Sequence, residues 1–425
     1  MAASSIHAPD IHEAHTRHVV GLRLLPFLFV LYVVNYIDRT NLAYAAVGMS
    51  RTLGFNDRVF GLGAGIFFIS YLTLQIPGAL MVERFGARRL ISSCMIAWGS
   101  LTVLTSLVHT PIQLYGARFV LGAAEAGFFP GVIVYLSYWF IREDRAKATG
   151  NFMGAIPISS MLASPLAGWI LGRSWLGVDG WRWLFVAEGV PAIILGTVAY
   201  FYLTDRPSDA AWMHPAGRDW LLRKLEEERP ARTANSGFWE ALRSPVVPVL
   251  AGTTFLAYFA QYTFIFWFPL LLKRLSGMSD LHVGLWGALP FLLSFLLLQI
   301  NGWHSDRTAE RRWHAAVPLL AAAAGFLLLT THPREMGVLM FFFLLAATGT
   351  AYMSVFWAMP SEILSPTIAA TAVGLINSVG SMAGFAAPYA FGYLRTATGS
   401  VNPGLVLAAL SSFGAGVLVL CAPRR

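Results

Sequence analysis

Residues 78–89 of the chain read GALMVERFGARR, and residues 302–312 read GWHSDRTAERR. Each segment contains a small residue, an acidic residue followed by arginine, and then two arginines in a row. Each also follows the second long apolar stretch in its half of the chain. A charged loop repeated at matching positions predicts an internal duplication, with two halves of the chain built alike.

The composition of the chain predicts a membrane protein. Hydrophobic residues make up 56% of the 425 residues and charged residues only 12%, whereas soluble domains contain about 25% charged residues. The net charge of +8 is explained by arginines in loops that orient the chain, and we expect no nucleic-acid partner. The cysteines Cys94 and Cys421 lie far apart in apolar segments, so no structural disulfide is expected.

Apolar stretches separated by glycine, proline and charged residues predict twelve membrane-spanning helices, each of about 20 residues or more. The polar segment 204–243 divides them into two groups of six, and its LLRKLEEE sequence predicts an exposed helix. We therefore expect a six-helix bundle in residues 1–203, a cytoplasmic linker at 204–243 and a second six-helix bundle in residues 244–425. The predicted spans are 20–46, 58–80, 90–108, 113–137, 145–171, 181–203, 245–272, 280–302, 312–330, 335–357, 366–392 and 402–421.

The distribution of lysine and arginine predicts the orientation of the chain. Most of these 30 residues fall near the two termini, in the central linker and in the loops that would share their side of the membrane. Because cytoplasmic loops are enriched in positive charge, both termini are expected in the cytoplasm. The first span is too long for a signal peptide, and Asp38 and Arg39 interrupt it.

The first predicted span contains two adjacent opposite charges. Residues 32–44 read YVVNYIDRTNLAY, with Asp38 next to Arg39. A charge at the bilayer centre costs about 2.5–3.5 kcal/mol, so a charged residue inside a span indicates a functional site. Asn35 precedes the pair by one helical turn and is expected to share or flank its face.

The fourth predicted span contributes a second pair of charges. Arg118 and Glu125 are seven residues apart, which places them on one helix face about 10.5 Å apart. The two acids and two arginines together carry no net charge, and protonating either acid makes the site positive. Binding of a proton and of an organic anion would then favour each other, and arginine can hold a carboxylate through two parallel hydrogen bonds. The alternative is that the four charges form two structural ion pairs that hold helices together.

Motifs of other functional classes are absent from the sequence. No glycine-rich loop ending in Gly-Lys-Ser/Thr is present, so ATP hydrolysis by a phosphate-binding loop is not expected. Neither a HExxH nor a GxSxG motif is present, so an intramembrane enzyme is not expected either. We predict a transporter that uses no cofactor and no metal ion.

The spans, the linker and the repeated loop together resemble the major facilitator superfamily. Longer segments resemble its anion:cation symporter family: NYIDRTNLAYA, RFVLGAAEAGFFPGVIVYLSYWF, GWRWLFVAEGVPAIILG, FWAMPSEIL and GLINSVGSMAGFAAPYAFGYL. They lie in both halves of the chain. The resemblance implies proton-driven import of a small organic anion, such as a sugar acid, tartrate or an aromatic acid. It also implies a monomer in the bacterial inner membrane. An exchanger or facilitator without proton coupling is the alternative, and the sequence does not identify the acid.

The resemblance also implies roles for individual residues. Asp38 and Glu125 match the proton-coupling acids, and Arg39 and Arg118 match positions of the anion site and charge relay. Further substrate-site residues would be Tyr36, Tyr71, Asn377 and Asn35. The gating motif would comprise Glu83, Arg84, Arg88, Asp306 and Arg307, although Ala79 and Glu83 depart from the usual Gly and Asp of the first copy.

Several remaining features are less specific. Glu188, in the segment AEGVP, is expected to pair with a loop arginine, and Glu362 is expected near the cytoplasmic surface. Glycines spaced four residues apart permit close helix packing. In this fold spans two and eleven face each other, as do spans five and eight. The glycine pairs are Gly61/Gly65, Gly127/Gly131, Gly150/Gly154 and Gly380/Gly384.

Overall fold

The computed structural model describes residues 11–228, 240–241 and 243–423. Within these residues the chain is helical and contains no β-strand. The helices before the linker, called the first bundle, are α1 (Ile11–Leu53), α2 (Asp57–Phe85), α3 (Ala87–Thr105), α4 (Pro111–Glu125), α5 (Phe128–Trp139), α6 (Arg142–Met153), α7 (Ala155–Leu171) and α8 (Gly180–Tyr202).

The linker contains the short helix η1 (Pro207–Asp209) and helix α9 (Pro215–Glu227). The helices after it, called the second bundle, are α11 (Val246–Ser276), α12 (Asp280–Thr308), α13 (Arg312–Leu329), α14 (Met336–Ala347), η2 (Thr348–Tyr352), α15 (Met353–Phe356), α16 (Met359–Ile363), α17 (Pro366–Ser381), α18 (Ala383–Thr398) and α19 (Asn402–Leu420). The helix predicted in the linker is thus confirmed as α9.

Ten helical segments of the described chain are long and apolar enough to cross a membrane. The predicted spans 90–108 and 366–392 are also helical, as α3 and as α17 with α18, but they are not among these ten. Several predicted spans consist of two helices. The span at 113–137, for example, breaks between α4 and α5.

Helix ends and breaks follow local sequence signals. Thr110 and Gln113 form a reciprocal capping box at the start of α4, and Gly399 ends α18 in the left-handed conformation. At the break after α4, a Cβ on Gly78 would lie 2.6 Å from the Cα of Gly127. Two backbones can approach this closely only because both positions are glycine.

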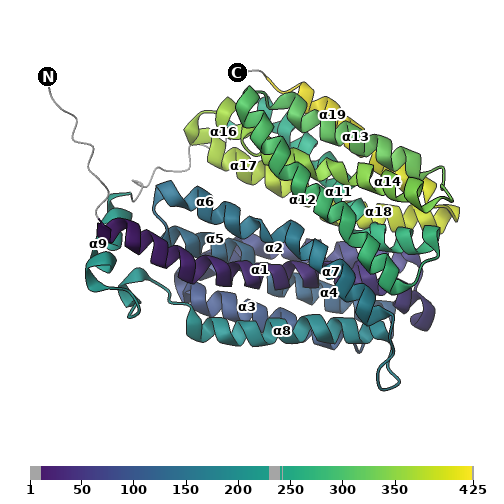
Figure 1. Cartoon of the computed structure of the whole chain (residues 1–425), viewed down its shortest axis with the longest axis horizontal. Helices are drawn as coiled ribbons and strands as arrows, with labels where there is room; N and C mark the ends of the chain where they lie inside the picture. The colour runs from purple at the N-terminus through teal and green to yellow at the C-terminus, as the bar shows by residue number, and fades with distance from the viewer. Residues whose placement is uncertain (1–10, 229–239, 242, 424–425) are drawn as a thin grey trace.

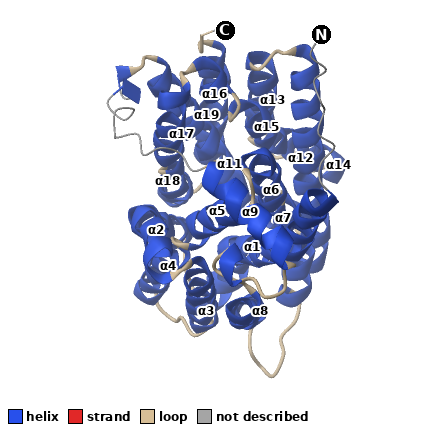
Figure 2. Cartoon of the chain, turned by 90° about the vertical axis from the view of Figure 1, so that its left-hand side faces the viewer, coloured by secondary structure: helices blue, strands red, loops and turns tan. Residues whose placement is uncertain are grey.

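The two bundles lie one above the other in Figure 1, and Figure 2 shows them nearly end-on. Helix α9 and the start of α1 lie on the left in Figure 1, which we call the linker side. The opposite end is called the far side. Helices α2 and α18 pack together across the bundles, as do α7 and α12 and also α1 and α11. The predicted facing of spans two and eleven, and of five and eight, is therefore confirmed.

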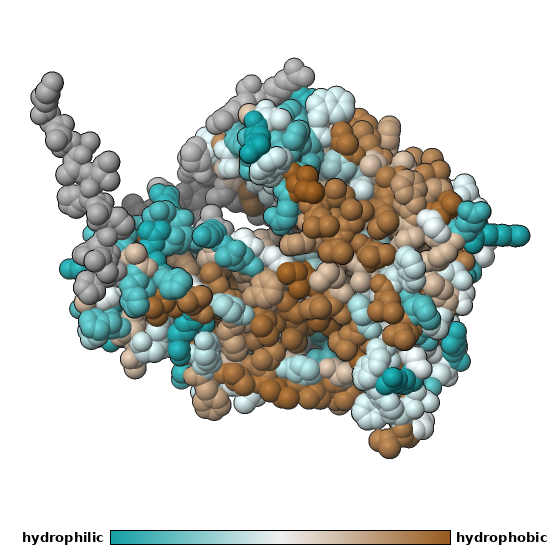
Figure 3. Space-filling model, viewed as in Figure 1, coloured by the Kyte–Doolittle hydropathy of each residue, from teal (hydrophilic) through white to brown (hydrophobic). Residues whose placement is uncertain are grey.

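The bundles are in closer contact on the far side than on the linker side. The space-filling view shows a hollow between them toward the linker side and continuous contact at the other end (Figure 3). On the far side, a Cβ on Gly168 of α7 would lie 2.8 Å from the Cα of Gly284 of α12. Toward the linker side, a Cβ on Gly150 or Gly374 would meet nothing within 4 Å. Access from the linker side is thus the more open route into the molecule.

Candidate functional site

Arg39 of α1 forms an ion pair with Glu125 at the end of α4. Its Nη2 and Nε both donate to Oε2 of Glu125, at 2.8 and 3.2 Å, and Nδ2 of Asn35 donates to the same oxygen at 3.1 Å. Glu125 is fully buried, and its Oε1 has no hydrogen bond within the described chain. The carboxylate thus holds the Arg39 guanidinium through a single oxygen atom.

Asp38 points away from this pair, toward α3. Thr102 donates to its Oδ2 at 2.7 Å, and Nδ2 of Asn41 donates to its Oδ1 at 2.9 Å. Asp38 is fully buried and has no ion pair in the part of the chain that the structure describes. Two hydrogen-bond donors therefore stabilise its charge in place of an arginine.

Arg118 is buried beside the ring of Phe67. Its guanidinium carbon lies 4.9 Å from that ring's centre, and its Nε donates to the carbonyl of Gly63 at 3.4 Å. Its two terminal nitrogens have no hydrogen-bond partner among the described residues. Arg118 and Glu125 are thus both buried on α4, but the arginine that pairs with Glu125 is Arg39.

Aromatic rings surround the Arg39 guanidinium. Its central carbon lies 4.8 Å from the ring centre of Tyr71 and 5.8 Å from that of Tyr36, distances at which a cation is attracted to a ring face. From the second bundle, Tyr262 of α11 lies close enough to Arg39 and Tyr36 to interact electrostatically with both. The cluster therefore brings together side chains from both bundles.

Asn377 and Glu188 do not make the contacts that the sequence led us to expect. Asn377 is half-buried on α17 of the second bundle and has no hydrogen bond to the cluster within the described chain. Among the described residues no loop arginine pairs with Glu188, in contrast to the expected pairing. Glu188 lies well inside α8, is only 3% exposed and faces α1 instead.

The predicted gating residues lie on the linker side. The backbone N–H of Arg88 donates to Asp205 at 2.8 Å, and its guanidinium lies 3.7 Å from the same carboxylate. Arg84 lies over the ring of Phe85, and Arg307 lies over that of Trp303. The side chain of Glu83 is outside the described part of the structure.

In the second copy of the repeated motif, Asp306 pairs with Arg311 rather than with Arg307. Arg311 also pairs with Glu362 at 3.0 Å. Its hydrogen bond to Asp306, together with that to Glu362, raises the pKa of the Arg311 guanidinium. The charged contacts of this copy join elements of the second bundle, whereas those of Arg88 join α3 of the first bundle to the start of the linker.

An ion-pair cluster joins the two bundles on the far side. Asp57, at the start of α2, accepts two hydrogen bonds from Arg274 of α11, at 2.6 and 2.7 Å. Arg395 of α18 lies 3.6 Å from the same carboxylate, and the backbone N–H of Arg58 donates to Thr396 at 3.1 Å. These contacts, called the far-side latch, hold α2 against the second bundle.

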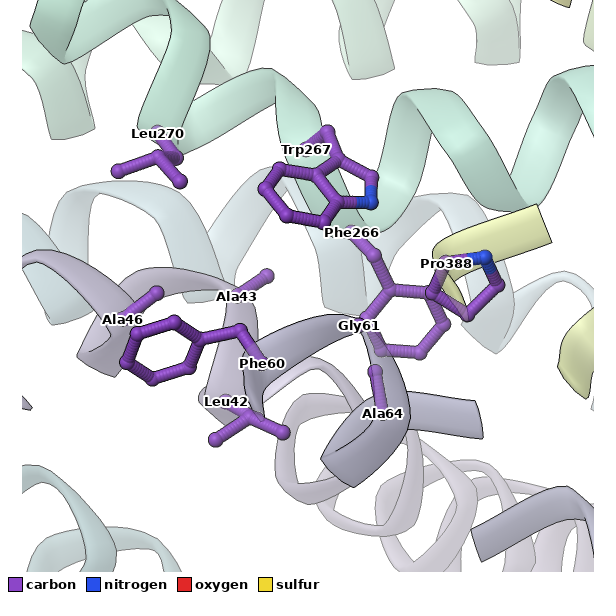
Figure 4. A pocket seen from close by; sticks show the side chains of 10 residues that line it. All are labelled: Leu42, Ala43, Ala46, Phe60, Gly61, Ala64, Phe266, Trp267, Leu270 and Pro388. Carbon is purple, nitrogen blue, oxygen red and sulfur yellow. The ribbon is translucent and has the colours of Figure 1, made fainter. Parts of the chain in front are cut away.

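Between the polar cluster and the latch lies a small apolar pocket, with room for about one water molecule (Figure 4). Residues of α1, α2, α11 and α18 line it, with Phe60 and Gly61 facing Phe266 and Trp267. No charged side chain lines it, so it does not suit an anion. The apolar side chains around it instead separate the polar cluster from the far side.

The chain has the fold of a membrane transporter. The sequence profile of the Major Facilitator Superfamily matches residues 28–388. The chain belongs to this superfamily, and it is a transporter rather than an enzyme. The recognition made from the sequence motifs is therefore confirmed at the level of the superfamily.

Individual relatives match almost the full length of the chain. A putative tartrate transporter of Agrobacterium vitis is 38% identical, covering 96% of this chain and 94% of that protein. A quinolone resistance transporter of Acinetobacter baumannii is 34% identical, covering 92% and 91%. The crystal structure of a bacterial homologue of the human lysosomal transporter Spinster is 21% identical, with a TM-score of 0.73, covering 96% and 95%. The last likeness supports the fold.

Proposed function

We propose that the protein imports a small carboxylate together with protons, as a member of the anion:cation symporter family. The observation that carries the proposal is the Arg39–Glu125 ion pair. Arg39 retains 11% side-chain exposure, whereas Glu125, Asp38 and Arg118 are fully buried. An anion that enters the cluster therefore reaches Arg39 first among these charges.

Proton coupling follows from competition for Arg39. While Glu125 is ionised, it occupies Nε and Nη2 of the guanidinium. Protonation of Glu125 removes the attraction, and the guanidinium becomes available for two parallel hydrogen bonds to a substrate carboxylate. One proton and one anion thus bind together, with no net change in the charge of the cluster.

The closed far side and the open linker side fit one state of an alternating-access cycle. We assign the linker side to the cytoplasm, because the arginines of the repeated loops and the linker lie there. The membrane would be the bacterial inner membrane, and the transporter would function as a monomer. Import then requires a second state in which the latch is open and the linker side closed.

The test is uptake of radiolabelled tartrate into proteoliposomes with an imposed pH gradient. The tartrate probe follows from the name of the Agrobacterium relative. We expect accumulation that a protonophore abolishes. The variant Glu125→Gln should lose accumulation but retain counterflow, because exchange needs no net proton movement. Uptake that is equal with and without the pH gradient would instead support an exchanger or facilitator.

The quinolone resistance relative raises drug export as a second candidate. Quinolones also carry a carboxylate, so the Arg39 site could serve either substrate. The direction of transport separates the two functions. Efflux of a quinolone from loaded vesicles against its gradient, without tartrate uptake, would favour export.

A further inference from the structure

Glu188 is a buried acid without a role in the proposed exchange between Glu125 and the substrate. Neither of its carboxyl oxygens has a hydrogen bond of normal geometry within the described chain. The next residue is Gly189, where a Cβ would lie 2.5 Å from the carbonyl oxygen of Gly99. The backbones of α8 and α3 are therefore in contact beside this carboxyl group. A functional or structural reason is needed for an acid in such a place.

The polar side chains close to the Glu188 carboxyl group come from α1. The Asn41 side chain lies beside the Glu188 carboxyl, and its Nδ2 also donates to Asp38 at 2.9 Å. Tyr44 of α1 is also close to Glu188, and Ser164 of α7 is near the Tyr44 hydroxyl. Asn41 therefore stands between two buried carboxyl groups, which makes it a link from Glu188 to Asp38.

The ionisable groups around Glu188 are few. Helix α1 contributes Asp38 and Tyr44, and α7 has no ionisable side chain along Ala155–Leu171. In the buried part of α3 the ionisable residue is Cys94, whose thiol lies near Gly127 instead. No arginine or lysine in the described chain pairs with Glu188, so an ionised carboxylate there would lack a compensating charge.

The charge balance of the membrane interior leads to the same conclusion. The cluster has two guanidinium groups, and Glu188 is its third carboxyl group after Asp38 and Glu125. Glu125 accepts three hydrogen bonds and Asp38 accepts two, so donors stabilise the charge of each. Beside Glu188 the described chain places only the Asn41 amide, whose nitrogen already donates to Asp38, and neither Glu188 oxygen accepts a hydrogen bond of normal geometry. A proton on Glu188 would restore the balance to two acids and two arginines.

The unpaired acceptor atoms around Glu188 indicate which hydrogen bond a proton on this residue can form. Oδ1 of Asn41 is buried and lacks a donor within the described residues, as do both oxygens of Glu188. An ionised carboxylate offers only acceptors, whereas a protonated one supplies an O–H donor. A protonated Glu188 can thus donate to the Asn41 amide oxygen, and the amide nitrogen is then held toward Asp38.

We propose that Glu188 is a fixed, neutral carboxylic acid that positions Asn41, and through it the proton-coupling carboxyl of Asp38. It keeps its proton throughout the transport cycle. Its role differs from that of Glu125, which binds and releases a proton in each cycle. This inference rests on the proposed proton symport for its transport readouts, but the protonation state of Glu188 can be measured independently.

The direct test is infrared spectroscopy of the full-length protein in lipid at alkaline pH. We expect a carboxylic-acid C=O stretch in the wild type that disappears in Glu188→Gln and persists in Glu125→Gln. If the wild type lacks this band, or if Glu188→Gln leaves it unchanged, the proposal is wrong. This measurement needs no transport, so it stands even if tartrate is not a substrate.

The transport test compares two substitutions at the same position. Glutamine preserves a neutral donor, so Glu188→Gln should retain gradient-driven accumulation, whereas Glu125→Gln should lose it. Glu188→Ala frees Asn41, and the Asp38 carboxylate loses a donor that stabilises its charge. The alkaline limb of the uptake–pH profile should then rise by about one pH unit, the equivalent of one lost hydrogen bond.

A further variant guards against loss of folding in Glu188→Ala. Asn41→Leu removes the link while leaving Glu188 in place, and it should give the same upward shift of the alkaline limb. If Glu188→Gln instead loses accumulation but retains counterflow, Glu188 cycles its own proton and the proposal fails. If wild-type uptake ignores the pH gradient, proton symport fails, and the infrared result alone decides the state of Glu188.

Discussion

The two ends of the molecule use charged residues differently. On the far side, Asp57 of the first bundle pairs with Arg274 and Arg395 of the second. On the linker side, Arg88 of the first bundle pairs with Asp205 at the start of the linker, and Arg311 pairs within the second bundle. In the proposed alternating-access cycle, contacts between the bundles must break for the far side to open, whereas contacts outside that interface can persist. Contacts between the bundles can therefore set the balance between the far-side-closed and far-side-open states. The linker-side contacts instead contribute to the rigidity of each bundle.

The largest effect on transport is expected from a substitution that separates α7 from α12 on the far side. A Cβ at position 168 would lie 2.5 Å from the carbonyl oxygen of Asp280, so Gly168→Ala should force α7 and α12 apart. Overpacking costs about 1–3 kcal/mol, so transport should fall about tenfold. Hydrogen exchange should rise in both helices near this contact. Gly150→Ala is the matched control, and an equal effect there would remove the asymmetry between the two ends.

A smaller effect is expected from the far-side latch. Asp57→Asn removes the negative charge that holds Arg274 and Arg395. We expect faster hydrogen exchange at the start of α2 and a several-fold change in transport rate, because hydrogen bonds to charged groups contribute about 1.5–3 kcal/mol. Asp179→Asn is the control, since Asp179 has no ion pair within the described chain. Unchanged exchange in Asp57→Asn would mean that apolar packing alone closes this side.

A still smaller effect is expected on the linker side. Arg311→Gln breaks the pairs with Asp306 and Glu362, which lie within the second bundle. Thermal stability should fall by about 1 kcal/mol, since both acids are partly exposed, and hydrogen exchange on the far side should not change. Arg312→Gln serves as the neighbouring control. Far-side opening in Arg311→Gln would show that this pair acts between bundles after all.

The smallest effect concerns Glu310, which accepts backbone hydrogen bonds at the start of α13. Partial burial acts to raise its pKa, but hydrogen bonds from the N–H groups of Trp313 and His314 and from the His314 ring lower it overall. The stabilisation is therefore complete above the unfolded pKa and is lost as pH falls through the lower folded pKa. Glu310→Gln should cost less than about 1 kcal/mol at neutral pH. Thermal unfolding should show the difference from wild type vanish in acid.

The sequence revealed the charged members of the site more clearly than their partners. Asp38, Arg39, Arg118 and Glu125 were visible because each interrupts an apolar stretch, where a charge is costly. Their pairing depends on the rotation of α1 against α4, which a single sequence does not determine. The direct pairing of Glu125 with Arg39 therefore emerged only from the structure.

Neutral members of the site gave a weaker signal in the sequence. Asn41, Thr102 and Tyr262 resemble residues that join helices in any membrane protein, so nothing separated them from their neighbours. Glu188 stands out as an acid in the segment AEGVP, but the expected pairing with a loop arginine is not found among the described residues. The predicted spans contain three acids in this region (Asp38, Glu125 and Glu188) but only two arginines (Arg39 and Arg118). That difference indicates that one acid has no arginine partner.

The composition of α3 has a consequence for how the protein enters the membrane. This helix supplies Thr102 to Asp38, yet it is not among the segments apolar enough to cross a membrane by themselves. Hydroxyl groups along it, and Arg88 and Arg89 at its start, weaken its preference for lipid. Its stable insertion during synthesis should therefore wait for α4 and α8, which cover it in the folded protein. The helix that supplies Thr102 to the buried cluster would then be one of the last of its bundle to settle in the bilayer.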